Sequence, residues 1–166
     1  MLHHVQTAII FPQMEKTTRS RIFHLSILKK TYLELILTGR KNIESRLTMT
    51  RKAPFDQIAA GDFIYFKLSS GPVCGTATVK KIAQFSNLDK KEIKRIEGRY
   101  NDQICGEPEY WRQKSQCGYC LLIWLSDVKR IEPIQIEKSD MRAWVILDQK
   151  TNYNLPREKP GKSGKT

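Results

Sequence analysis

The octapeptide GRKNIESR, residues 39–46, brings together three side chains that bind ions or hydrogen-bonding groups. A lysine ammonium suits a phosphate as a flexible point charge, and an arginine guanidinium offers a planar fork to a phosphate or a guanine edge. A carboxylate repels phosphate but accepts a hydrogen bond from an exocyclic amino group, as on cytosine. Lys41, Glu44 and Arg46 therefore predict a site for a ligand with both a phosphate and a base.

The same residues also allow a purely structural interpretation. Polar and apolar residues alternate along residues 42–47, which is the period of a strand, so Glu44 and Arg46 should point to the same side. On one strand face they could form a salt bridge with each other or with a neighbour. The residue types alone leave both interpretations open.

Two elements should lead into the octapeptide. Residues 22–28, IFHLSIL, have the character of a strand, and KKTYLELILTG carries apolar residues at helical spacing. Thr31 and Glu34 have the spacing of a capping box, and Gly39 stands where a left-handed C-terminal cap is wanted. The sequence therefore predicts a short helix that ends as the octapeptide begins.

The rest of the chain alternates strand patterns with one further helix pattern. Residues 107–115, EPEYWRQKS, are expected to form a polar connection, and Pro133 should make its strand an edge strand or a bent one. The strands expected at 63–68 and 73–82 should form a hairpin through the turn at 69–72. The expected strands are 63–68, 73–82, 120–125, 130–136 and 142–147, and the expected helix is 88–100. The order predicts an α+β fold, a small closed or partly closed β-barrel flanked by two helices.

Length and composition indicate one ordinary domain. The chain has 166 residues, of which 40% are hydrophobic and 28% charged, enough for a packed core without disulfides or a structural metal. We expect an N-terminal extension at 1–21, the domain at 22–149 and a disordered basic tail at 150–166.

Charge favours a polyanionic partner. There are 29 lysines and arginines against 17 acids, a net charge of +12. Roughly half of the excess lies in the two end segments. A basic surface that serves only solubility remains an alternative.

The four cysteines and the apolar segments indicate whether the protein binds a metal, in which compartment it works and whether it spans a membrane. Cys117 and Cys120 have the spacing of half a zinc site, but a second pair of ligands is missing, and Cys120 could equally open a buried strand. We expect no metal and no cofactor. The N-terminus lacks a signal-peptide pattern and no apolar run is long enough to span a membrane, so a cytoplasmic protein is expected.

Three segments in order carry a resemblance to a known family. The octapeptide resembles the G-x-K-x-x-E-x-R motif of ASCH domains, members of the PUA-like superfamily. HLSILKKTYLELILTGRK and IAAGDFIYFK are similar to the segments around that motif, and the last strands look like those of longer bacterial members. The resemblance covers about 23–148. It implies a barrel with a cleft between barrel and helices, lined by the motif, and a role in binding RNA.

Several basic and aromatic residues are candidates to support such a site, because cations beside aromatic rings suit phosphate contact and base stacking. Trp144 is also a candidate for the core, and Tyr110 and Trp111 could cover the cleft. The supporting candidates are Lys29, Lys30, Arg51, Lys52, Lys67, Arg142 and Trp144.

Catalysis is the alternative to binding. Some proteins that resemble this family are ribonucleases, or amidohydrolases that remove the acetyl group of N4-acetylcytidine with a lysine, a threonine three positions later and a distant glutamate. Here Glu44 stands where the threonine would be, which weighs against the amidohydrolase. For RNA cleavage, Lys41, Glu44 and Tyr65 would be the acid and base groups, with His24 as a further candidate. A protein-interaction module is a third possibility.

Overall fold

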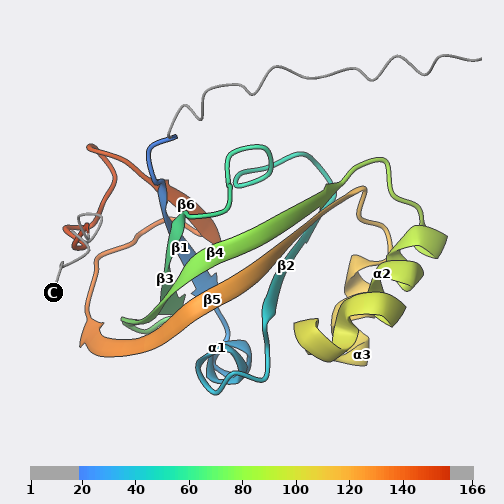
Figure 1. Ribbon diagram of the computed structural model, residues 1–166, viewed down its shortest axis with the longest axis horizontal. Coiled ribbons are helices and arrows are strands. Elements are labelled where there is room, and N and C mark those ends of the chain that lie inside the picture. Colours follow the sequence, from blue (N-terminus) through green and yellow to red (C-terminus); the bar gives the residue numbers. More distant parts are fainter. Residues whose placement is uncertain (1–18, 158–166) are drawn as a thin grey trace, which may run out of the picture.

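One curled sheet and three helices make up the part of the chain that the structure describes, residues 19–157 of a computed structural model (Figure 1). The strands are β1 (Phe23–Leu28), β2 (Ile43–Thr48), β3 (Phe63–Leu68), β4 (Val73–Phe85), β5 (Tyr119–Ile134) and β6 (Trp144–Leu147). The helices are α1 (Lys30–Leu37), α2 (Lys90–Ile104) and α3 (Pro108–Lys114). The expected α+β class with a partly closed barrel is confirmed.

The sheet is a half-barrel rather than a closed ring. Its strand order is β2-β5-β4-β3-β1-β6, so β2 and β6 are the two edges. Pairing is antiparallel except between β1 and β3, and the expected β3–β4 hairpin is present. The long β4–β5 pair shifts register at several places along its length, and such bulges increase twist and bending. This bending lets the two edges approach each other.

Apolar residues on both sides of the sheet explain the strand patterns. Leu33 and Ile36 of α1 are fully buried against one face, together with Ile64 and Phe66 of β3. The alternate residues of β3, among them Tyr65, pack in a separate cluster on the other face. Burial on both faces accounts for the continuous apolar run of β3.

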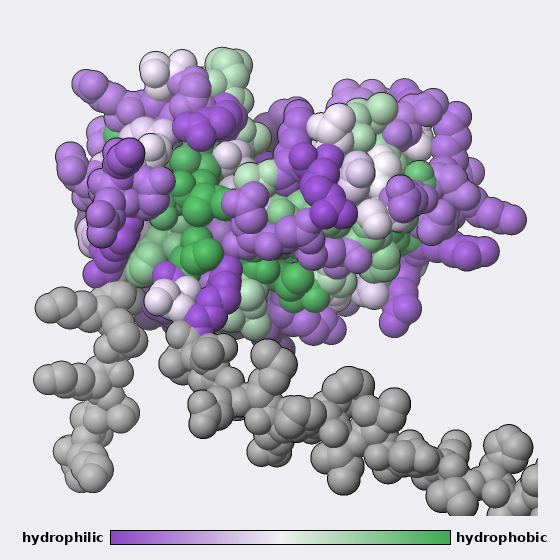
Figure 2. Space-filling model, turned by 90° about the horizontal axis from the view of Figure 1, so that it is seen from above, coloured by the Kyte–Doolittle hydropathy of each residue, from purple (hydrophilic) through white to green (hydrophobic). Residues whose placement is uncertain are grey.

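The helices α2 and α3 lie together beside β2 and β5, as Figure 1 shows. Ile93 and Ile96 of α2 and Trp111 of α3 form a cluster with buried residues of both strands. Hydrophilic side chains cover most of the face seen in Figure 2, and apolar surface is confined to narrower areas between them. No helix within 19–157 combines the length and apolar character that crossing a membrane requires.

The start of α1 differs from the prediction. Thr31 lies inside the helix, because the amide of Leu33 already bonds to the carbonyl of Lys29 and makes Lys29 the N-cap. The prediction of a capping box at Thr31 and Glu34 is therefore wrong. The end of α1 is as predicted: Gly39 has a φ of 81°, the left-handed conformation that suits glycine.

Two other predictions are corrected. Residues 107–115 contain the helix α3, which sequence periodicity missed because this short helix buries a single side chain, Trp111. Residues 120–125 and 130–136 belong largely to one strand, β5. Pro133 is tolerated there because β2 pairs only with Tyr119–Trp124, which leaves the later half of β5 with a free edge.

Two residues outside the expected domain limits of 22–149 make contacts with it. Leu155 is buried in the same cluster as Tyr65, and Arg19 pairs with Asp62, so both contact the domain. The remainder of the two expected end segments, residues 1–18 and 158–166, lies outside the described residues.

A buried carboxylate ties the N-terminal segment to the sheet. Asp62 is 1% exposed, and its oxygens accept from Arg19 at 2.6 Å, from His24 Nε2 at 3.0 Å and from the amides of Ile22 and Ala59. Burial alone would raise the pKa of Asp62, but these hydrogen bonds outweigh that effect and lower the pKa to about 2. The ionised form therefore stabilises the fold.

Replacing Asp62 with Asn should reduce the free energy of unfolding by ~2 kcal/mol at pH 7. The carboxyl has an ordinary pKa of 3.8 and a folded pKa of about 2. Its contribution is thus complete above about pH 4 and is lost as pH falls toward about 2. Urea unfolding at several pH values should show the wild type and Asp62→Asn converging as the pH falls.

The matched control is Asp102→Asn, which changes an exposed carboxylate on α2. It should leave both the stability and its pH dependence nearly unchanged. A constant difference between wild type and Asp62→Asn from pH 7 to pH 2 would contradict the prediction.

Candidate functional site

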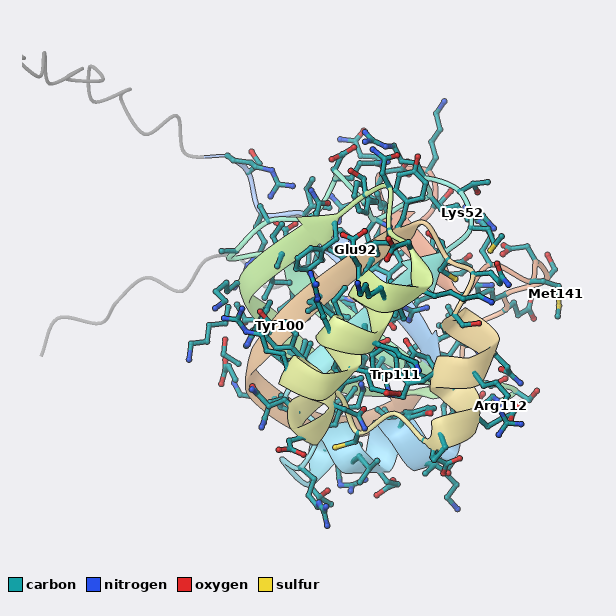
Figure 3. The ribbon with its side chains drawn as sticks, turned by 90° about the vertical axis from the view of Figure 1, so that its right-hand side faces the viewer. Lys52, Glu92, Tyr100, Trp111, Arg112 and Met141 are labelled. Carbon is teal, nitrogen blue, oxygen red and sulfur yellow. The ribbon has the colours of Figure 1, made fainter. Side chains whose placement is uncertain are left out.

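A cleft of about 860 Å³, lined by both charged and apolar side chains, lies between the two edges of the curled sheet. Residues of β2 line one side and residues around β1 and β6 line the other, with α3, the start of α1 and the 52–55 loop around them. Figure 3 shows Lys52 and Met141 on the side of the molecule occupied by α3, away from Tyr100. The charged residues of the lining are Lys29, Glu44, Arg46, Lys52, Glu107, Glu109, Lys114 and Arg142.

Arg46 spans the gap between the sheet edges. It projects from β2, donates to Ser26 Oγ of β1 at 2.6 Å, and places its guanidinium 4.9 Å from the ring centre of Trp144 in β6. Its Nε lies 3.2 Å from Glu44 Oε1. The side chain therefore connects strands that share no backbone hydrogen bonds.

Glu44 is a buried carboxylate with an unused oxygen. It is 4% exposed, and Oε1 faces Arg46 while Oε2 lies 3.7 Å from Lys41 Nζ. Within residues 19–157, Oε2 has no hydrogen-bond partner. Both parts of the sequence interpretation hold here: Glu44 and Arg46 share one side of the strand and form a salt bridge.

Lys41 lies beneath Glu44 instead of in the large cleft. It is 3% exposed and donates to the carbonyls of Ile43 and Ile104, both at 2.7 Å. Burial lowers the pKa of the Lys41 ammonium, and the Glu44 carboxylate opposes that shift. The expected contact with a phosphate is thus replaced in this structure by two carbonyls and a carboxylate.

Tyr110 of α3 forms part of the cleft wall. Its hydroxyl lies 2.7 Å from Ser45 Oγ, and burial raises its pKa. Asn101 fixes the α2–α3 turn by accepting from Gly106 N and Trp111 Nε1 and by donating to the Gly106 carbonyl. A Cβ at Gly106 would come within 2.8 Å of both aromatic side chains, so glycine lets α3 approach this closely.

Other predicted residues also line the cleft. Lys29 and Arg142 stand at its edge, and Arg142 is paired with Asp140. Trp144 is buried, as its candidacy for the core predicts, and it also lines the cleft under Arg46. Its Nε1 donates to His24 Nδ1 at 3.1 Å.

Several predicted residues, Lys30 among them, lie outside the lining. Arg51 pairs with Asp56, and Lys67 donates to the carbonyl of its neighbour Leu68. Tyr65 packs on the opposite face of the sheet, where its hydroxyl donates to the Pro156 carbonyl. The fold therefore does not bring Tyr65 together with Lys41 and Glu44.

Sequence reasoning missed the contribution of α3. Glu107, Glu109, Gln113 and Lys114 all line the cleft, and Trp111 packs in the cluster beneath the helix. The signal available was Pro108 directly after Glu107, since proline favours the first position of a helix.

The two cysteines that have the spacing of half a zinc site are core residues. Cys117 and Cys120 are buried in the cluster under α2 and α3. Burial raises the pKa of both thiols, that of Cys120 to about 12, which disfavours the thiolate that binds metals. Between residues 19 and 157, no three His, Cys, Asp or Glu side chains are grouped to hold a metal ion.

Fold and site together define a class of protein: a curled α+β half-barrel with a cleft at its open side. Solved structures share it: ASCH from Zymomonas mobilis matches with a TM-score of 0.62 at 17% identity, over 78% of this chain and 90% of that one. A tyrosine-to-phenylalanine mutant of that Zymomonas mobilis protein matches with a TM-score of 0.63 at 18% identity, over 79% of this chain and 94% of that one. At sequence identities of 17% and 18%, the similarity establishes the fold alone.

The family follows from the sequence match together with this fold. The family described as ASCH domain matches residues 27–93, which contain the octapeptide. Residues 27–93 thus match the ASCH domain family, as the resemblance predicted, and the fold agrees with that of solved ASCH structures. A comparison with curated proteins gave no significant match.

Replacing Glu44 with Ala should destabilise the protein by ~3 kcal/mol, because it leaves two buried or half-buried cations without their carboxylate. Thermal or urea unfolding of the purified variant measures this. Glu109→Ala, which breaks an exposed pair with Arg112, should cost less than ~1 kcal/mol. Equal effects of the two changes would refute a structural role for the buried cluster.

Proposed function

We propose that the cleft binds single-stranded nucleic acid, with RNA as the expected form. The observation that supports it most is a buried carboxylate with an unused oxygen in a cleft whose lining also holds, besides Arg46 and the carboxylates of Glu107 and Glu109, four further cations. The cations are Lys29, Lys52, Lys114 and Arg142. The net charge of +12 and the RNA-binding role implied by the ASCH resemblance support this assignment.

The positions of the charges favour a particular orientation of the strand. A phosphate near Glu44 would be repelled, whereas at the edge of the cleft it would meet Lys52 and Lys114. A base can enter more deeply, because the walls include aromatic side chains such as Tyr110 and Trp144. Phosphates are therefore assigned to the edge and a base to the interior.

Lys41 receives a different role from the one its sequence position indicated. Its ammonium donates to two carbonyls and stands behind Glu44. We assign it to holding the carboxylate in place, so that it acts on the ligand through Glu44.

Binding is favoured over RNA cleavage by the arrangement of the candidate groups. Tyr65 is on the opposite face of the sheet, and Lys41 and Glu44 face each other and backbone carbonyls. A general acid and base must both reach the reacting ribose and phosphate. Cleavage remains the alternative that the binding assay can reveal, as labelled RNA that becomes shorter.

The test is fluorescence anisotropy of a mixed-sequence single-stranded RNA at several salt concentrations. Binding should weaken steeply with salt, and Lys52→Ala with Lys114→Ala should reduce the slope of log K against log salt by roughly one unit. The matched control removes Lys91 and Lys94, two exposed lysines of α2 outside the lining. It should reduce the slope less.

Two outcomes would overturn the proposal. One is the absence of salt-dependent binding by the wild type. The other is an equal loss in the cleft variant and in the α2 control, which would mean a diffuse electrostatic attraction in place of a site. RNA-independent capture of a protein partner together with the first outcome would support an interaction module.

A further inference from the structure

A second, smaller cavity of about 40 Å³ lies next to the cleft. Tyr32, Glu44, Ser45 and Tyr110 line both spaces, so the small cavity is a pocket in the wall of the larger one. Its size admits a water-sized group, whereas an aromatic ring needs a cavity on the order of 150 Å³. A water molecule or a small substituent of a ligand in the cleft can enter it, but a whole ring cannot.

The chemistry of this pocket is set by Glu44 and Lys41. Oε2 of Glu44 is buried and accepts no hydrogen bond within the described chain, while Oε1 faces Arg46. Lys41 directs hydrogen bonds to the carbonyls of Ile43 and Ile104. The pocket therefore offers an unused acceptor, and an unused buried acceptor costs free energy until a donor reaches it.

The surrounding charges exclude small ions. An anion would be repelled by the Glu44 carboxylate. A metal cation would stand beside the Lys41 ammonium, 3.7 Å from Oε2, and the Arg46 guanidinium, 3.2 Å from Oε1. A neutral N–H donor satisfies the carboxylate without either repulsion.

We propose that this pocket receives the exocyclic amino group of a base, so that the cleft prefers cytosine and adenine to uracil. The inference rests on the proposed function, because it needs a nucleic-acid strand in the cleft. Cytosine and adenine carry an amino donor at the ring edge that would reach Oε2. Uracil carries a carbonyl oxygen at the corresponding place, and this oxygen would face the carboxylate, acceptor against acceptor.

Arg46 completes the recognition. Its Nη2 donates to Ser26, and its Nη1 makes no hydrogen bond in residues 19–157. In cytosine and adenine the ring nitrogen beside the amino group is an acceptor. A donor from Arg46 beside an acceptor from Glu44 matches that pair of groups.

The decisive measurement compares octamers of cytidine, adenosine and uridine at one salt concentration. Their phosphates are equal in number, so the electrostatic contribution is closely matched. Cytidine and adenosine octamers should bind about tenfold more tightly than the uridine octamer. An octamer of the 2-pyrimidinone ribonucleoside, which differs from cytidine only by lacking the amino group, should bind as weakly as uridine.

The outcomes separate this inference from the proposed function. If all four octamers bind equally, the pocket reads no amino group and the inference fails, while binding in the cleft stands. If none binds, the proposed function itself fails. Tighter binding of uridine than of cytidine would also overturn the inference.

A variant gives an independent readout. Glu44→Gln keeps the size of the side chain but can turn an amide N–H₂ toward the ligand, so the cytidine-over-uridine preference should vanish. Glu97→Gln on α2, outside both cavities, should retain it. A folded Glu44→Gln protein that still prefers cytidine would overturn the inference, and the octamer comparison stands on the wild type if this variant fails to fold.

Discussion

The guanidinium of Arg46 joins two edges of a sheet that backbone hydrogen bonds leave open. It reaches from β2 to Ser26 of β1 and to Trp144 of β6. A closed barrel would fill this gap with a ladder of hydrogen bonds, and no cleft would remain there. A single long side chain leaves space above it, so the contact that closes the half-barrel also forms part of the binding surface.

Arg46 depends in turn on a line of alternating charges. Glu44 stands between Arg46 and Lys41, and Lys41 is fixed by the carbonyl of Ile104 at the end of α2. The octapeptide therefore connects the start of β2, the end of α2 and the opposite sheet edge. Burying one of these charges alone would be costly, which is why they occur together.

A chain of buried hydrogen bonds begins at Trp144. The indole N–H can only donate, so His24 Nδ1 must accept, and the proton of a neutral imidazole is then on Nε2, where it donates to Asp62. Asp62 is held by Arg19 and two amides as well. The ring that lies under Arg46 is thus fixed by a buried network that begins before β1.

Local sequence determined most of the strands, the helices α1 and α2, the left-handed turn at Gly39, and the common side of Glu44 and Arg46. Apolar periodicity and glycine geometry act over a few residues, which is why these features could be predicted. The family motif contains Glu44 and Arg46, which line the cleft. Tertiary structure decided the rest. Lys41 bonds to a carbonyl 63 residues away, Tyr65 lies on the opposite face, and α3 forms a cleft wall with a single buried residue. These outcomes depend on strand order and on the curl of the sheet, and neither is encoded in the spacing of nearby residues.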